Sequence, residues 1–232
     1  MRNLRLVLVG TEGETNLGMA VRTAVNMGVD EIYLVSPRVR LDDEEVIRYA
    51  AHARRWLAWV RVVEGLEEAL DGVCISVCTS ARHNDWDALR TALELDALPL
   101  LLARYESAAI VFGRESVGLT REEIRLCDVL VTIPANPEYP VLNLAQSVAV
   151  VLYEASKARI LGDRLGYRAA SCRQLDSLRA MIRRLVEAYA EEQRREGAEA
   201  ALRHVIFRGA PSPGEASQIY RLFKALLRRV EA

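Results

Sequence analysis

Residues 108–123 read AAIVFGRESVGLTREE and contain three structural signals in immediate succession. The apolar run 108–113 is typical of a strand buried on both faces of a parallel sheet. A loop that places Arg114 and Glu115 between two glycines follows this strand. Thr120, with a glutamate three residues later, predicts a capped helix after the loop. Because open α/β sheets bind ligands at the carboxyl ends of their strands, this loop is a candidate binding site.

The same alternation of strand and helix extends through the first 160 residues. Five further runs are predicted strands: 4–10, 31–36, 59–64, 73–79 and 129–134. Helices are predicted over 17–28, 43–57, 64–71, 85–104, 120–127 and 143–160. This alternation is typical of an α/β fold, so residues 1–160 are predicted to form one domain around a parallel sheet.

The pattern changes after Ile160, where the linker-like segment GDRLGYRAAS (162–171) begins. Three helices are predicted beyond it, over 172–195, 197–207 and 213–230, so residues 161–232 are expected to form a small α-helical C-terminal extension. Its predicted core consists of Tyr189, Leu202, Val205, Ile206, Ile219, Leu222, Phe223 and Leu226. A segment of this size is too short to be robust alone, and we expect it to pack on the first domain or on a second copy.

The near-neutral net charge of −1 conceals an asymmetry along the chain. Residues 1–156 contain 15 arginines and 23 acidic residues, a net charge of −8. Residues 157–232 contain 14 arginines, 2 lysines and 9 acidic residues, a net charge of +7. A basic terminal segment favours an anionic partner such as nucleic acid, although a solvated helix face gives the same pattern.

Composition excludes several classes of protein. The chain has 232 residues, of which 51% are hydrophobic and 27% charged, which excludes a disordered chain, a collagen-like repeat and a secreted disulfide scaffold. It contains neither a signal peptide nor a run of about 18 apolar residues, so we expect a cytoplasmic protein without a membrane partner. Cys74, Cys78, Cys127 and Cys172 are interpreted as buried, reduced thiols in a reducing compartment rather than as a metal site.

Three further clusters of residues suit the binding of an anionic or nucleotide-like ligand. Asn16 is predicted to cap the first helix, which places Arg22 near its second turn among small and apolar neighbours. An arginine in that setting needs an anionic partner, a subunit contact or a phosphate, unless it is a plain surface residue. Residues 133–145, IPANPEYPVLNLA, form a proline-stiffened loop before a helix that Asn143 is predicted to cap. Residues 79–82, TSAR, end another predicted strand.

The glycines after the first strand do not indicate a nucleotide-binding motif. Gly10, Gly13 and Gly18 match neither the dinucleotide fingerprint nor a phosphate-binding P-loop. Ser36 and Pro37 stand at the end of the second strand, where a dehydrogenase has an acidic residue that binds the ribose. A nicotinamide-dependent oxidoreductase is therefore a weak alternative.

Taken in order, the patterns N-x-G-x-x-x-R (16–22), FGRExxGLT (112–120) and IPxNPxYxxLNLA (133–145) resemble the three motifs of the SPOUT class, in its SpoU/TrmH branch. The TSAR tetrapeptide and the helical tail narrow this resemblance to the TrmJ type. Enzymes of that type are tRNA 2′-O-methyltransferases that act on nucleotide 32 of the anticodon loop. The resemblance, clear over 4–156, implies a C-terminal trefoil knot in the α/β domain, S-adenosylmethionine as cofactor, tRNA as partner, and a homodimer with the active site across its interface.

The resemblance also implies roles for individual residues. Arg22 occupies the position of the family's catalytic arginine, Asn16 and Glu115 would orient it and the ribose, and Asn143 is the fourth implied catalytic residue. The implied cofactor pocket consists of Thr79, Ser80, Ala81, Gly113, Ile133, Pro140, Val141 and Leu142. Arg82 and Arg114 are the predicted RNA contacts. Because the sulfonium of the cofactor already activates the methyl group, no metal is expected.

One departure from the family's pattern leaves part of the function open. The third motif of the family usually carries serine immediately before Leu-Asn, where this chain has Val141. We therefore do not transfer a preference for cytidine or uridine. The alternatives are a 2′-O-methyltransferase of the same class that acts on ribosomal RNA or on another tRNA position, and a non-catalytic RNA-binding SPOUT protein.

Overall fold

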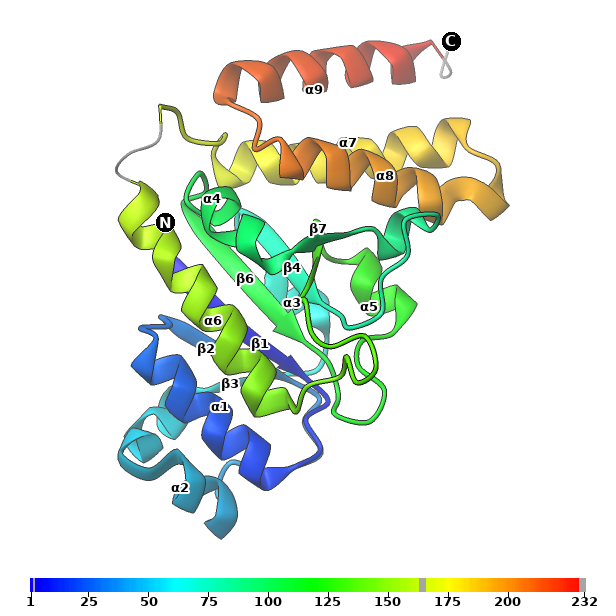
Figure 1. The fold of residues 1–232 in the computed structure, drawn as a ribbon. Coiled ribbons are helices and arrows are strands. Elements are labelled where there is room, and N and C mark those ends of the chain that lie inside the picture. The colour runs from blue at the N-terminus through cyan, green and yellow to red at the C-terminus, as the bar shows by residue number, and fades with distance from the viewer. Residues whose placement is uncertain (2, 163–165, 230–232) are drawn as a thin grey trace.

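The computed structural model describes residues 1, 3–162 and 166–229. Within these residues the chain forms a parallel sheet of seven strands in the order β3-β2-β1-β6-β4-β7-β5 (Figure 1). The strands are β1 (Asn3–Val9), β2 (Glu31–Val35), β3 (Arg61–Val63), β4 (Ile75–Thr79), β5 (Ala92–Glu94), β6 (Ser107–Phe112) and β7 (Val129–Thr132). Every pairing between them is parallel, which confirms the predicted α/β class.

The central strands are buried on both faces, as their apolar composition predicted. All six residues of β6 and all four of β7 are buried. The helices of the first part are α1 (Glu14–Asn26), α2 (Glu44–Ala50), α3 (Leu66–Leu70), α4 (Leu98–Leu102), α5 (Arg121–Arg125) and α6 (Leu144–Leu161). Helices α1, α4 and α6 pack on one face of the sheet, and α3 and α5 pack on the other.

The predicted helix over 85–104 is wrong in its first half. The chain forms a 3₁₀ turn over Ala88–Arg90, the short edge strand β5, and a second 3₁₀ turn over Leu95–Ala97 before α4 begins. Strand β5 pairs with β7, and its three residues are only partly buried or exposed. An edge strand this short lacks the continuous apolar run that revealed the other strands. The predicted helix over 43–57 likewise divides into α2 and a 3₁₀ segment, Ala51–Trp59.

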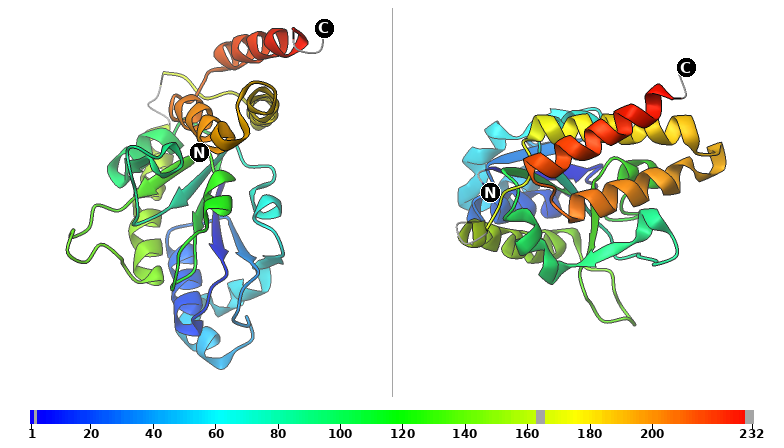
Figure 2. Two further views of the ribbon diagram at one scale, coloured as in Figure 1. Left: turned by 90° about the vertical axis from the view of Figure 1, so that its right-hand side faces the viewer. Right: turned by 90° about the horizontal axis from the view of Figure 1, so that it is seen from above.

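Three long helices follow the α/β part: α7 (Cys172–Tyr189), α8 (Arg195–Arg208) and α9 (Pro213–Arg228). Helices α7 and α8 lie against the end of the sheet, and α9 lies on the outer side of α7 (Figures 1 and 2). Residues 163–165 of the predicted linker and residue 230 of the last predicted helix lie outside the described residues.

The expected core of these three helices differs from the observed one. Val205, Leu222 and Tyr189 are exposed, with 71%, 59% and 54% of their surface accessible. Leu178 and Ile182 of α7 are instead fully buried and join the main core under the sheet. The outer faces of these amphipathic helices carry apolar residues too, and the sequence does not show which face of each helix packs against the α/β domain.

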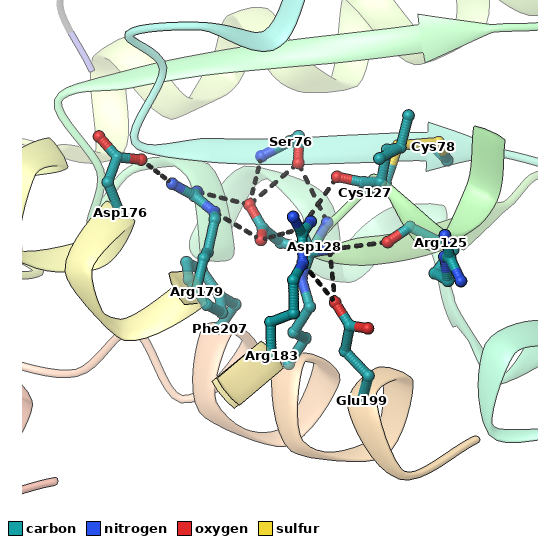
Figure 3. Close-up of polar contacts among 12 residues, drawn as sticks. Ser76, Cys78, Arg125, Cys127, Asp128, Asp176, Arg179, Arg183, Glu199 and Phe207 are labelled. Atoms are coloured by element: carbon teal, nitrogen blue, oxygen red, sulfur yellow. Dashed lines mark hydrogen bonds and ion pairs between the residues drawn. A yellow bond between two sulfur atoms is a disulfide. The ribbon is translucent and has the colours of Figure 1, made fainter. Parts of the chain in front are cut away.

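The buried carboxylate of Asp128 connects α7 and α8 to the sheet through hydrogen bonds (Figure 3). Asp128, fully buried before β7, accepts hydrogen bonds from the Arg179 guanidinium at 2.9 and 2.6 Å and from Arg203 Nη2 at 2.9 Å. Two more come from the backbone N–H and the hydroxyl of Ser76, at 2.9 and 3.0 Å. Burial alone raises the pKa of a carboxyl group, but the two guanidinium groups outweigh it and hold the pKa of Asp128 well below its usual range.

The cysteines correct a second prediction. Cys74 is bonded to Cys172 and Cys78 to Cys127, so the four residues form two disulfides rather than reduced thiols. Members of the pairs are separated by 98 and 49 residues along the chain, and only the tertiary fold brings them together. The first disulfide joins the segment before β4 to the start of α7. The cysteines therefore no longer support a reducing compartment.

Candidate cofactor pocket and catalytic residues

A pocket opens at the carboxyl ends of β4, β6 and β7. Its lining includes all eight residues of the predicted cofactor site: Thr79, Ser80, Ala81, Gly113, Ile133, Pro140, Val141 and Leu142. These residues come from three segments that are far apart in the sequence, and the segment between β7 and α6 projects from the body (Figure 2). The structure thus brings the predicted residues together where open α/β sheets bind ligands. Their contact with the cofactor stays a prediction.

Gly113 allows the wall of the pocket after β6 to form. Backbone hydrogen bonds in both directions between Arg114 and Gly118 close the loop, at 3.2 and 2.9 Å. A Cβ atom on Gly113 would lie 2.2 Å from the carbonyl carbon of Gly118 and 2.3 Å from the nitrogen of Leu119. Any larger residue at this position therefore opens the loop. Thr120 and Glu123 form the predicted capping box directly after it.

Three of the four predicted catalytic residues form a continuous hydrogen-bonded chain. Asn16 Nδ2 donates to Glu115 Oε1 at 3.0 Å, and Asn143 Nδ2 donates to Asn16 Oδ1 at 2.9 Å. The Glu115 carboxylate also accepts from the backbone N–H groups of Glu12 and Gly13, at 3.0 and 3.1 Å. Glu115 lines the pocket, so the chain extends from the pocket wall to the ends of α1 and α6.

The two asparagines differ in their helical roles. Asn143 caps α6 as predicted, because its Oδ1 accepts from the backbone N–H groups of Ala145 and Gln146 at 2.8 and 3.4 Å. The prediction that Asn16 caps α1 is wrong: Gly13 is the N-cap, and Asn16 lies in the first turn. The Asn16 side chain is therefore free to join Glu115 to Asn143.

Arg22 lies apart from these residues. It is exposed, sits two turns along α1 from Asn16, and is not part of the pocket lining. Among the described residues its guanidinium makes no hydrogen bond or ion pair. A single chain therefore assembles the pocket and the Glu115–Asn16–Asn143 chain without the arginine.

The two predicted RNA contacts have different surroundings. The Arg114 guanidinium binds both carboxylate oxygens of Glu123, at 3.0 and 2.8 Å, and this pairing raises its pKa. Its side chain also lies against Gly10. Arg82 is exposed at the edge of the pocket. Both assignments stay predictions, and Arg114 has a structural role in addition.

The lining suits S-adenosylmethionine in its chemistry. Leu119, Val131 and Leu144 add apolar surface to the predicted residues, as a flat adenine ring requires. Charged groups of both signs, from Glu115 and Arg90, stand in the same lining and match the ammonium and carboxylate of the methionine part. Arg90 was not predicted, because the segment around it was assigned to a helix. Within the described ranges, no cluster of side chains able to hold a metal ion and no helix able to cross a membrane is present.

Comparison with known proteins agrees with this geometry. Residues 3–153 match the SpoU rRNA Methylase family. A tRNA (cytidine-2′-O-)-methyltransferase TrmJ of Sulfolobus acidocaldarius is 40% identical over 158 residues, which are 67% of this chain and 66% of that protein. A tRNA (cytidine/uridine-2′-O-)-methyltransferase TrmJ of Pectobacterium atrosepticum is 40% identical over 165 residues, 70% of this chain and 67% of that protein.

A solved structure extends the similarity in fold to nearly the whole chain. TrmJ from Z. mobilis ZM4 superposes with a TM-score of 0.72 at 24% identity, over 97% of this chain and 99% of that one. The alignments to the two curated relatives, in contrast, span about two thirds of their length. The chain therefore belongs to the SpoU methylase family and resembles the TrmJ type within it.

Proposed function

We propose that the chain is a tRNA 2′-O-ribose methyltransferase that modifies nucleotide 32 of the anticodon loop. The observation that carries the proposal is the Glu115–Asn16–Asn143 hydrogen-bonded chain, which starts in the wall of the predicted cofactor pocket. These residues come from three separate motifs, and each asparagine amide donates to the next acceptor in the chain. The names of the two curated relatives support tRNA as the substrate class.

The bound cofactor supplies an electrophilic methyl group, so the residues of the chain act on the ribose. A 2′-hydroxyl is a poor nucleophile until its proton leaves, and a guanidinium stays protonated in proteins and is a poor base. We therefore assign Arg22 to binding the adjacent phosphate and stabilising negative charge on the 2′-oxygen. The Glu115–Asn16–Asn143 chain holds the loops that align the hydroxyl with the methyl group, and alignment supplies much of the acceleration.

The position of Arg22 supports a homodimer. An exposed apolar stripe runs along α6 through Val150, Tyr153 and Ile160, which are 38%, 55% and 68% accessible. Met19, on the outer side of the neighbouring helix α1, is 41% accessible and lies one turn from Arg22. A second copy that covers this face brings its own Arg22 toward the pocket of the first. The active site then contains residues of both subunits.

Three further assignments complete the proposal. We assign residues 1–160 to the methyltransferase domain and 161–232 to a tRNA-binding extension, whose helix α7 shares a buried core with the sheet and whose helix α8 contacts β7. A trefoil knot formed by the segments around the pocket follows from the family. A cytoplasmic location follows from the substrate.

The test is methylation of unmodified bulk tRNA with a labelled methyl donor, followed by mapping of the modified nucleotide. We expect label at nucleotide 32 and almost none with Arg22→Ala, whose melting temperature should equal that of the wild type because Arg22 has no partner in the described part of the chain. A variant that keeps more than about a tenth of the wild-type rate would contradict the role of Arg22, since tenfold equals about 1.4 kcal/mol. Label at another position would refute the assignment to nucleotide 32.

The non-catalytic alternative is tested by calorimetric titration with S-adenosylmethionine. Absence of binding at millimolar concentration would favour a purely RNA-binding protein and would contradict the proposed enzyme. Binding together with transfer to RNA excludes the non-catalytic protein. Cytidine and uridine preference is then read from tRNAs that differ only at the modified nucleotide.

A further inference from the structure

The most exposed aromatic side chain of the described residues stands beside the pocket and has no role in the proposed mechanism. Trp86 is 98% accessible, in the segment between β4 and β5. A tryptophan that folding leaves fully in water gains nothing from burial, and tryptophan is enriched at binding interfaces, where the partner covers its ring. The question is therefore what covers this ring when the protein works.

The segment that carries Trp86 is held in place on both sides. The backbone N–H of Asn84 donates to the carbonyl of Arg90 at 3.0 Å, and the N–H of Trp86 donates to Asn84 Oδ1 at 2.9 Å. Asp87 binds Arg121 at 2.7 Å, which neutralises its charge and lowers its pKa. The backbone that carries the ring is thus held in a structured turn, so little backbone entropy is lost when a partner stacks on the ring.

Residues of helix α8 also contact the segment that carries Trp86 and its partner Arg121. Arg208 Nη2 donates to the carbonyl of Thr91 at 2.5 Å, and Glu196 binds Arg121 at 2.6 Å. The C-terminal helices therefore fix the turn that carries Trp86, besides contributing positive charge of their own.

The base of this turn forms part of the pocket wall. Ser80, Arg82 and Arg90 all line the pocket, and Arg90 Nη1 lies 3.4 Å from Ser80 Oγ. His83, next to Arg82, is exposed as well. The tip of the turn thus places a tryptophan a few residues from a pair of arginines at the pocket mouth. Aromatic rings combined with cations in this way bind single-stranded nucleic acid, in which bases stack and phosphates meet positive charge.

We propose that Trp86 stacks on a nucleobase of the RNA substrate adjacent to the nucleotide whose ribose enters the pocket. The proposal rests on the proposed function. Bases of an anticodon loop are not all paired, so one can splay onto a protein ring while its neighbour is methylated. The contact holds the loop at the pocket mouth, which makes Trp86 an RNA-binding residue with no part in the chemical step.

A second exposed tryptophan provides a matched control. Trp59 is 79% accessible and stands just before β3, the edge strand at the opposite side of the sheet from β5. The segment that carries Trp59 does not line the pocket, and it is separate from the turn that carries Trp86. Trp59→Ala thus removes an equally large exposed ring from a place that the proposal does not involve.

The first experiment measures tRNA affinity and steady-state methylation of Trp86→Ala, Trp86→Phe and Trp59→Ala. We expect Trp86→Ala to raise Kd and KM for tRNA about tenfold, as loss of one base stack does, with kcat at saturating tRNA and affinity for S-adenosylmethionine unchanged. Trp86→Phe should recover most of the affinity, and Trp59→Ala should equal the wild type. Unchanged tRNA affinity in Trp86→Ala, or no recovery by phenylalanine, would overturn the proposal.

The second experiment separates the proposal from the proposed function. Trp56→Phe with Trp59→Phe leaves Trp86 as the only tryptophan of the chain. We expect unmodified tRNA, without any methyl donor, to quench its fluorescence, and a duplex RNA of equal length to quench it far less. If quenching occurs but no tRNA is methylated, stacking stands and the proposed function fails. If tRNA is methylated without quenching, stacking is wrong and the function stands.

Discussion

The Glu115 carboxylate accepts hydrogen bonds from the backbone N–H groups of Glu12 and Gly13, which precede α1, and from Asn16 in the first turn of α1. A carboxylate is an acceptor at both oxygens, whereas the amide of glutamine turns an N–H toward one of those donors. We expect Glu115→Gln to lower kcat by about 10- to 100-fold, equivalent to about 1.4–2.7 kcal/mol, because the hydrogen-bonded chain to Asn16 and Asn143 loses its anchor. Glu122→Gln, at an exposed site on α5, is the control. Equal turnover in the two variants would contradict the anchoring role.

His204 on α8 makes stability depend on pH in a defined direction. The side chain is buried, and burial followed by the nearby Arg208 and Arg203 lowers its pKa to about 4. An unfolded histidine binds its proton near pH 6.5, so between about pH 6.5 and 4 the unfolded chain holds more protons and stability falls as the pH falls. We expect a loss of about 2–3 kcal/mol across this range in urea unfolding.

His204→Gln should abolish this part of the pH dependence, since glutamine does not titrate. His83→Gln, at an exposed position, should retain it. Asp128 adds a separate loss only at lower pH, because its pKa lies below the usual range of a carboxyl group. A stability profile of His204→Gln that still falls between about pH 6.5 and 4 as in the wild type would show that His204 is not the responsible group.

At the scale of elements, the disulfide between Cys74 and Cys172 should contribute to how firmly α7 is attached. It closes a loop of 98 residues and joins α7 to the segment before β4. Loss of the disulfide therefore increases the conformational entropy of the unfolded chain. We expect Cys74→Ser with Cys172→Ser to lower the free energy of unfolding by about 2–5 kcal/mol without altering the pocket. The measurement is urea unfolding without reductant. A midpoint equal to that of the wild type would contradict this contribution.

The elements that were predicted correctly are those whose local sequence pattern matches their place in the folded structure. Five of the predicted strands are apolar runs that are largely buried. The edge strand β3 was found within a longer apolar run although two of its three residues are exposed, whereas β5, also three residues at the sheet edge, was missed. The capping residues Thr120 and Asn143 were found because a cap is a local interaction. The disulfides and the Asp128 cluster were missed because they join residues distant in sequence. Arg22, which was expected beside the other catalytic residues, lies outside the pocket lining of the single chain.

At the scale of the whole molecule, the positive charge of the C-terminal helices has a definite location. Arg221, Lys224 and Arg228 are exposed and recur at helical spacing along one face of α9. Deletion of the C-terminal helices would also remove Leu178 and Ile182 of α7 from the core that they share with the sheet. Substitution of exposed residues on α9 avoids this loss of core packing. We expect replacement of all three by glutamine to weaken tRNA binding and to reduce the slope of log Kd against log salt by about 0.7–0.9 for each phosphate that the variant no longer binds.

The control for this variant removes an equal charge from the acidic part of the chain, at the exposed Arg40, Arg54 and Arg55. If positive charge affects tRNA binding only through the net charge of the protein, both variants change tRNA binding equally. If α9 contacts phosphates, only the α9 variant reduces the salt slope. An unchanged slope in the α9 variant would place the RNA elsewhere on the surface.

The proposed assembly of the active site from two copies can be tested by complementation. Arg22→Ala and Glu115→Gln are each expected to be strongly impaired, and a heterodimer of the two contains one site in which an intact Arg22 from one subunit faces an intact Glu115 from the other. Coexpression with two different tags and tandem purification should therefore yield about half of the wild-type activity, since one of two symmetric sites is complete. If Arg22 acted within its own chain, neither subunit would hold both residues and the heterodimer would remain as impaired as its parents. Failure to recover any doubly tagged protein would contradict the dimer itself, because the apolar stripe on α6 would then have no second copy to cover it.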